Sequence, residues 1–256
     1  MKVVILAGGY GTRIYQESEI RPKPMIEIGG MPIIWHIMKE YSHYGHNDFI
    51  ICAGYKQEII KEWFANYFLY NNDVTFDFND NHKMLVHNKK SEPWKVTICD
   101  TGLDTPTGAR INKVKQYIGD DDFLLTYGDG VCDVNINDVI TFHNNHDKVA
   151  TITAVKKPQD KGILEINRDL TVKAFREKSV VDSALINAGY MVLRTSIFEY
   201  LNDNSSLENE VLPLLANTNE LKSYIHEGYW QCMDTIREKL ELEDLIKNNK
   251  AYWIKW

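Results

Sequence analysis

The sequence predicts an α/β protein: a mixed, mainly parallel central sheet between two layers of helices, with a smaller lobe from the second half of the chain. The main observation is that strand-length apolar runs alternate with segments of helical periodicity over residues 1–155, because β-α units of this size build parallel sheets. The second is composition. The 256 residues are 44% hydrophobic and 25% charged, which suits one large domain or one domain with a small addition.

The first half supplies most of the predicted sheet. Residues 3–6 form an apolar strand, and residues 33–44 form a helix that Gly45 ends. Residues 56–69 give the clearest helix, because their apolar side chains recur on one face. Those side chains are Ile59, Ile60, Trp63, Phe64, Tyr67 and Phe68. The other predicted strands of this half cover residues 48–52, 123–127 and 149–155, with short ones near 74–78, 84–88 and 95–100, and the other predicted helices cover 109–117 and 135–145.

After residue 155 the pattern changes. No linker, repeat or low-complexity segment separates the two halves, so we expect residues 1–256 to form a single domain. The tail AYWIKW is expected to dock on its own fold, with a contact between subunits as the alternative. Short strands are predicted near 162–166, 171–176 and 185–193, followed by helices near 195–202, 208–216 and 235–247.

Composition excludes several classes of protein. A net charge of −7 disfavours nucleic acid as a partner. There is no apolar run of about 18 residues that would span a membrane, and no secretion signal precedes the first strand. The four cysteines lack a C-x-x-C pair, which favours free thiols in the reducing cytoplasm over disulfides or zinc. An acidic protein that binds anions must gather its cations locally or recruit a metal.

The strongest functional signal is the string VVILAGGYGTRIYQESEIRPKPM over residues 3–25. A strand runs into a loop with Gly8, Gly9 and Gly11, whose backbone can approach a ligand closely and direct several N–H groups at one anion. Arg13 adds a forked donor for phosphate oxygens, and Lys23, between two prolines, adds a compact charge. These parts predict a polyphosphate receptor, with an ordinary tight turn as the alternative. The glycine spacing fits neither the dinucleotide fingerprint nor a P-loop.

Two aspartates are candidate metal ligands. Asp129 follows the predicted strand 123–127 between two glycines. Because ligands of open α/β sheets bind at the carboxyl ends of strands, a hard oxygen ligand there suits Mg²⁺ beside a triphosphate, and an Asp-Gly turn is the alternative. Asp234 directly precedes a predicted helix, where the alternative reading is an N-cap. The acidic run 120–122 precedes its strand and is expected to be a solvated turn.

A second group of candidates suits a sugar phosphate. Glu177 and Lys178 follow the predicted strand 171–176, and Asn187 lies in an Asn-Ala-Gly turn. A carboxylate suits sugar hydroxyls and an ammonium suits a phosphate, while a surface ion pair is the alternative.

The string LAGG-x-GTR followed by P-K-P-M resembles the signature of the sugar-1-phosphate nucleotidyltransferases. The resemblance covers essentially the whole chain. Longer strings resemble the cytidylyltransferases of that family that act on glucose 1-phosphate, namely MPIIWHIMKEYSHYGHNDFIICAGYK, IKEWFANYF, EPWKVTICDTG, TGARINKV, LLTYGDGV and GYWQCMDTIREK. Two positions depart from the family pattern: Ser179 stands where proline is usual, and Ala109 stands where glycine is usual.

The resemblance implies a Rossmann-like three-layer α/β/α fold of the nucleotide-diphospho-sugar transferase type. Residues 1–155 would be the nucleotide-binding part, and residues 156–256 the sugar-binding and C-terminal part. It implies CTP and glucose 1-phosphate as substrates, Mg²⁺ on Asp129 and Asp234, and a homo-oligomer, with a hexamer as the expected assembly. The pyrimidine would lie on residues 100–110.

The resemblance also assigns roles residue by residue. Catalysis falls to Arg13, Lys23 and Asp129, and the sugar phosphate to Glu177, Lys178, Asn187 and Gly189. The implied nucleotide-binding residues are Leu6, Ala7, Gly8, Gly9, Tyr10, Gly11, Thr12, Arg13, Lys23, Asp104, Thr107, Gly108, Ala109, Arg110 and Gly128.

Three alternatives remain open. The first is a related nucleotidyltransferase that uses UTP, dTTP or another sugar phosphate. The second is a metal-dependent glycosyltransferase, which would need a D-x-D motif, whereas Asp129-Gly130-Val131 lacks the second acid. The third is a non-catalytic nucleotide-sugar sensor, which predicts lost metal or loop residues, yet none of the candidates is missing.

Overall fold

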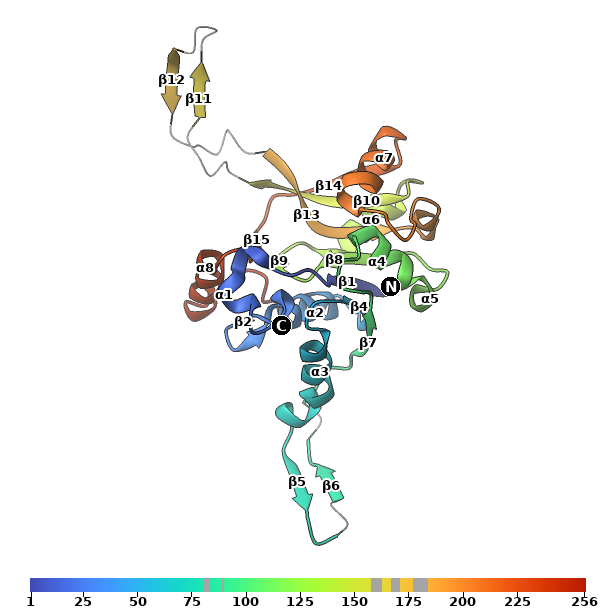
Figure 1. The fold of residues 1–256 in the computed structure, drawn as a ribbon, viewed down its shortest axis with the longest axis vertical. Coiled ribbons are helices and arrows are strands. Elements are labelled where there is room, and N and C mark those ends of the chain that lie inside the picture. The colour runs from blue at the N-terminus through green and yellow to red at the C-terminus, as the bar shows by residue number, and fades with distance from the viewer. Residues whose placement is uncertain (81–82, 89, 158–162, 167–170, 177–183) are drawn as a thin grey trace.

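The computed structural model of the protein describes residues 1–80, 83–88, 90–157, 163–166, 171–176 and 184–256. A seven-stranded sheet forms its centre (Figure 1). In spatial order its strands are β14 (Leu221–His226), β10 (Ala150–Lys157), β13 (Ala184–Leu193), β8 (Phe123–Tyr127), β1 (Val3–Ala7), β4 (Asp48–Ala53) and β7 (Lys95–Asp100).

The sheet is mixed. β1 pairs in parallel with β4 and β8, β4 with β7, and β10 with β14. Only β13 runs antiparallel to its neighbours, β8 and β10, among the described strands of this sheet. The predicted mixed, mainly parallel sheet is therefore confirmed. The sheet also joins strands from both halves of the chain, since β10, β13 and β14 lie beside the N-terminal strands.

Helices cover both faces. One core includes residues of α2 (Ile33–His43), α3 (Gln57–Asn71), α6 (Ile136–Asn144) and α8 (Ile236–Lys247). The other includes residues of α4 (Thr107–Lys113), α5 (Lys115–Ile118) and α7 (Leu212–Asn217). β1 alternates between them, with Val3 and Ile5 in the first core and Val4 and Leu6 in the second, because successive strand side chains point to opposite faces. This gives the expected three layers.

The predicted helices differ from the observed ones at three places. The helix expected over 109–117 is divided at Val114 between α4 and α5. The segment expected over 195–202 is the 3₁₀ helix η4 (Thr195–Glu199), and that over 208–216 begins with the π-helical turn η5 (Leu207–Val211) before α7. Apolar periodicity alone does not separate α, 3₁₀ and π geometry.

Several short elements complete the described chain. The hairpin of β5 (Val74–Asp77) and β6 (Lys83–Val86) extends beyond α3, away from the main sheet (Figure 1). The others are η1 (Thr12–Ile14), α1 (Tyr15–Ser18), η2 (Lys23–Met25), β2 (Glu27–Ile28), β3 (Met31–Pro32), β9 (Gly130–Cys132), β11 (Ile163–Ile166), β12 (Val172–Arg176) and β15 (Trp230–Cys232).

The aromatic tail docks on its own fold, as expected. Trp253 is fully buried and stacks on Tyr229, with ring centroids 5.7 Å apart. Trp256 meets Trp35 edge-on at 6.0 Å. Among the described residues, every helix is too short or too polar to cross a lipid bilayer.

Candidate active site

A cleft lies at the carboxyl ends of the parallel strands β1 and β8, with the segment after β7 on one side. Its volume is about 480 Å³. This is where ligands bind in open α/β sheets, since neighbouring connections diverge there. The residues that line it are Leu6, Ala7, Gly8, Gly9, Gly11, Thr12, Lys23, Pro24, Thr105, Pro106, Thr107, Arg110, Tyr127, Gly128, Asp129, Ser206, Glu208 and Asp234.

Arg110 fixes the glycine-rich loop against the segment after β7. Its guanidinium donates to the carbonyls of Gly8 and Leu103 at 3.2 and 2.9 Å. It also donates to the Gly102 carbonyl at 2.7 Å and to the Thr101 hydroxyl at 2.6 Å. A Cβ at Gly8 would lie 2.0 Å from Arg110 Nη1, so glycine is required for this approach. Arg110, only 4% exposed, therefore shapes the cleft by holding its two loops together.

Of the residues that the resemblance assigned to the nucleotide and whose side chains the structure describes, four are absent from the lining of this cleft. The Tyr10 hydroxyl donates to Asp104 at 2.7 Å, which joins the tip of the glycine-rich loop to the segment after β7. Gly108 and Ala109 face the interior instead. The Ala109 amide donates to the Ser205 carbonyl at 2.9 Å, and a Cβ on Gly108 would approach the same oxygen to 2.8 Å. The packing of α4 accounts for the position of both residues, and their role in nucleotide binding stays a prediction.

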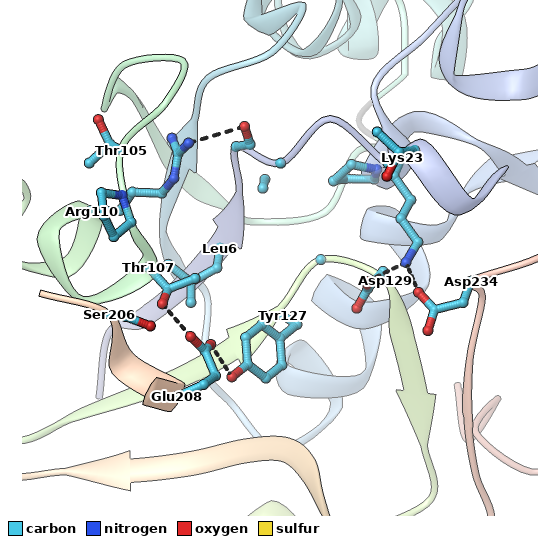
Figure 2. Close-up of a pocket in the computed structure, with 18 residues that line it drawn as sticks. Leu6, Lys23, Thr105, Thr107, Arg110, Tyr127, Asp129, Ser206, Glu208 and Asp234 are labelled. Atoms are coloured by element: carbon cyan, nitrogen blue, oxygen red, sulfur yellow. Dashed lines mark hydrogen bonds and ion pairs between the residues drawn. The ribbon is translucent and has the colours of Figure 1, made fainter. Parts of the chain in front are cut away.

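Lys23 extends into the other end of the cleft. A 3₁₀ turn positions it: Pro22 precedes η2, and the Met25 amide donates to the Pro22 carbonyl at 2.8 Å. The Lys23 ammonium donates to Asp129 Oδ2 at 2.6 Å and to Asp234 Oδ1 at 2.5 Å (Figure 2). Burial alone lowers the pKa of Lys23, but these two carboxylates raise it above its ordinary value, so the side chain carries a full positive charge.

A short antiparallel ladder brings the two aspartates together. β9 begins directly after Asp129, and it pairs with β15. The ladder continues by one further bond, from the Met233 amide to the Asp129 carbonyl at 2.8 Å, so Asp234 comes next to Asp129. The alternative reading of Asp234 as a helix cap is wrong. Thr235 is the N-cap of α8 and forms a capping box with Glu238.

The pair of carboxylates fits a divalent cation. Both already converge on one cation, the ammonium of Lys23. Oxygen ligands from Asp129 and Asp234 at a polar cleft are the donors that Mg²⁺ prefers. Within the described part of the chain, these acids lie at the same cleft as the glycine-rich loop.

Comparisons with known proteins agree with this geometry. Residues 2–248 match the model of the nucleotidyl transferase family. The chain belongs to the nucleotidyl transferase family. It is 51% identical over 258 residues to the glucose-1-phosphate cytidylyltransferase of Salmonella typhimurium and to that of Salmonella typhi, covering 100% of each chain. The crystal structure of HddC from Yersinia pseudotuberculosis shares the fold at 24% identity and a TM-score of 0.66, covering 96% of this chain and 99% of that one.

The family resemblance therefore rests on the whole chain, and the family expected from the glycine-rich loop is confirmed. The side chain of Arg13 lies outside what the structure describes, as do residues Glu177, Lys178 and Ser179. The roles that the resemblance gives these residues stay predictions.

A smaller pocket, about 310 Å³ in volume, adjoins the cleft of this nucleotidyl transferase on the side of β13. Asn187 lines it, and its side-chain oxygen accepts a hydrogen bond from the Gly189 amide at 2.9 Å. The Trp230 indole donates to the Ala188 carbonyl at 2.8 Å. The pocket shares Tyr127, Asp129, Glu208 and Asp234 with the main cleft, so a ligand in one would meet a ligand in the other.

Sequence reasoning missed Tyr127 and Glu208. Tyr127 ends the predicted strand 123–127, one residue before Gly128, and the rule for strand ends applies to it as well as to Asp129. Glu208 lies in a stretch expected to be an ordinary helix, without a motif that marks it. Only the tertiary structure places it in the cleft.

Proposed function

We propose that this protein transfers the cytidylyl group of CTP to α-D-glucose 1-phosphate and releases pyrophosphate, giving CDP-glucose. One observation supports the proposal most: a chain 51% identical over its full length to a glucose-1-phosphate cytidylyltransferase holds a lysine between two carboxylates in a glycine-lined cleft. The adjoining pocket beside Asn187 offers room for the sugar.

The chemistry needs positioning and charge neutralisation. An oxygen of the sugar phosphate attacks the α-phosphorus of CTP in line, and the bond from that phosphorus to the pyrophosphate breaks. Because the nucleophile is already anionic, no general base is required. The amides of the loop from Gly8 to Thr12 would hold the leaving pyrophosphate together with Arg13, and Lys23 would stabilise charge on the α-phosphate.

Asp129 and Asp234 would hold Mg²⁺ in this scheme. When bound, the ion neutralises phosphate charge and orients the triphosphate. The chain's own contribution is to keep the two carboxylates together through the ladder of β9 and β15. Lys23 is then free to turn its ammonium from the carboxylates to a phosphate oxygen.

The sugar and the base would occupy opposite sides of Asp129. Glu177, Asn187 and Gly189 would contact the glucose and Lys178 its phosphate, as the resemblance implies. The pyrimidine would lie on residues 100–110, where carbonyls and amides fixed by Arg110 offer donors and acceptors for the base edge. Cytosine presents an N4 donor and an N3 acceptor, which separates it from uracil and thymine.

The test is pyrophosphate release by the purified protein with each of four NTPs and a panel of sugar 1-phosphates, with Mg²⁺ or EDTA. We expect turnover with CTP and glucose 1-phosphate that requires the metal. The variant Asp129→Ala should be inactive, while Asp80→Ala, an exposed acid on the β5–β6 hairpin, should be unaffected. Turnover with another nucleotide in place of CTP would show that CTP is not the substrate. No turnover with any nucleotide would refute the proposal.

We propose further that the chain acts as one catalytic unit within a homo-oligomer in the cytoplasm, with the hexamer implied by the resemblance as the expected assembly. Within the described part of the chain, Cys52, Cys99, Cys132 and Cys232 form no disulfide, as suits a reducing compartment. Phe76, Met84 and Leu85 on the β5–β6 hairpin are between 43% and 53% exposed, which suits burial against another subunit. Light scattering after size-exclusion chromatography measures the assembly.

A further inference from the structure

Glu208 lies where the main cleft meets the adjoining pocket. It belongs to η5, whose N-cap Ser206 accepts a hydrogen bond from the Asn209 amide. The carboxylate accepts from the Thr107 hydroxyl at 2.5 Å and from the Tyr127 hydroxyl at 2.6 Å (Figure 2). Glu208 lines both the main cleft and the adjoining pocket. Its position is thus fixed from two elements, α4 and β8.

The carboxylate retains capacity for further donors. An ionised carboxylate has about four acceptor sites, and two described hydroxyls use one site on each oxygen. Burial and the negative charge of Glu208 raise the pKa of Tyr127, so the phenol stays protonated and donates. Glu208 is exposed to the solvent of the cleft. A ligand with hydroxyl or amine donors would therefore find an oriented negative acceptor there.

The covalent structure of a nucleotide indicates which of its groups would reach Glu208. The phosphates would lie by Lys23 and Asp129, and like charge keeps them away from Glu208. The base would lie by residues 100–110. Ribose links these two ends, so it must cross the space between them. Glu208 accepts one hydrogen bond from Thr107, at the base end, and one from Tyr127, two residues before Asp129, at the metal end.

We propose that the Glu208 carboxylate accepts hydrogen bonds from the ribose hydroxyls of the nucleotide and so makes the enzyme selective for ribonucleotides. This inference rests on the proposed nucleotidyl transfer. Thr107 and Tyr127 orient the carboxylate. Glu208 thereby determines specificity for the pentose without contacting the reacting phosphorus.

The test compares CTP with 2′-deoxy-CTP and 3′-deoxy-CTP as substrates of the wild type, Glu208→Gln and Glu208→Ala. We expect the wild type to prefer CTP over at least one deoxy analogue. Glu208→Ala should reduce that preference about 10-fold or more, the size of one hydrogen bond to a charged acceptor, by lowering kcat/KM for CTP while leaving the deoxy analogue unchanged. Glu208→Gln, which keeps an oxygen acceptor, should show a smaller reduction.

Glu210→Gln is the matched control. Glu210 is exposed on the same π-helical turn, and neither the cleft nor the adjoining pocket includes it among their lining residues. It should keep the wild-type preference. Thermal melts identify a variant that is unfolded, and the Gln variant preserves the packing if the Ala variant does not.

An equal preference in the wild type and both variants would overturn the inference. Two other results in the Glu208 variants would also overturn it, if the preference for CTP over the deoxy analogues stayed the same. A changed ratio of kcat/KM for CTP and UTP would place Glu208 at the base, and a changed KM for the sugar phosphate would place it at the sugar. If the wild type released pyrophosphate from no nucleotide, the proposed function itself would be refuted. This result differs from those that refute only the role of Glu208.

Discussion

Lys23 occupies a position that a divalent cation would need, and removing its charge should have two opposite effects. Asp129 Oδ2 and Asp234 Oδ1 each lie within 2.6 Å of the same nitrogen, so these oxygens are at most about 5 Å apart. Two negative charges at that separation repel by about 3 kcal/mol at an effective dielectric constant of about 20. Because the acids are 32% and 20% exposed, about 1–3 kcal/mol is a reasonable range.

The variant Lys23→Met keeps a chain of similar length and loses the charge. Without nucleotide, its paired carboxylates should bind Mn²⁺ about 10-fold more tightly than those of the wild type, because the ion relieves the repulsion and no longer competes with an ammonium. Isothermal titration calorimetry measures this affinity. In the same variant kcat/KM should fall on the order of 10²–10⁴-fold, because the charge that would stabilise the α-phosphate is missing.

Lys39→Met is the matched control, since Lys39 pairs with Glu92 at 3.0 Å outside the cleft. It should change neither metal affinity nor turnover. Unchanged or weaker Mn²⁺ binding by Lys23→Met would refute the reasoning, because the ammonium would then not compete for these two acids. Stronger Mn²⁺ binding by Lys23→Met with full activity would show that Lys23 competes with the metal but takes no part in the reaction.

Three further predictions concern stability. Gly189→Ala should lower the free energy of unfolding by about 1–3 kcal/mol in chemical denaturation, because Gly189 has φ of +85° and a Cβ would lie 2.4 Å from the ring of Tyr127; an unchanged midpoint would contradict this. Thr235→Ala removes the N-cap of α8 and should cost about 1 kcal/mol, whereas no loss in urea unfolding would argue against the capping box. Burial lowers the pKa of His36 to about 4, and its ring contacts the Ile28 carbonyl at 2.9 Å and the Trp253 indole at 3.4 Å. The unfolded chain then binds the extra proton from about pH 6.5 downward, so the free energy of unfolding should fall by up to about 3 kcal/mol between pH 6.5 and 4, and a flat profile would disprove it.

The parts of the site that were predictable come from local signals. β1 and the glycines after it are adjacent in the sequence, and Lys23 follows between two prolines, so one string contains loop and cation. Asp129 follows a strand whose predicted bounds, 123–127, are those observed. The rule that ligands bind at carboxyl ends then needs only the parallel pairing of β1 and β8.

Arg110 shows how much of a side chain's role depends on tertiary structure. Its guanidinium lines the cleft and donates to the Thr101 hydroxyl and to backbone carbonyls, and its assignment to the nucleotide stays a prediction. That arrangement depends on the approach of the loop at Gly8 to the segment after β7, which no single string contains. The N-cap of α8, in contrast, could have been predicted from the sequence, because Thr235 followed three residues later by Glu238 is the signature of a capping box.

Only the family resemblance implied that Asp129 and Asp234 converge; periodicity could not predict it, because the strands that cause it are only three residues each. β9 and β15 are too short for periodicity, and their pairing joins segments about 100 residues apart. Asp234 is held between two elements: the ladder of β9 and β15 before it, and α8, with its N-cap Thr235, after it. An ion pair of 2.5 Å between Lys239 and Glu17 joins α8 to α1. The segment that follows the glycine-rich loop therefore also anchors the helix whose N-cap, Thr235, directly follows the second acid.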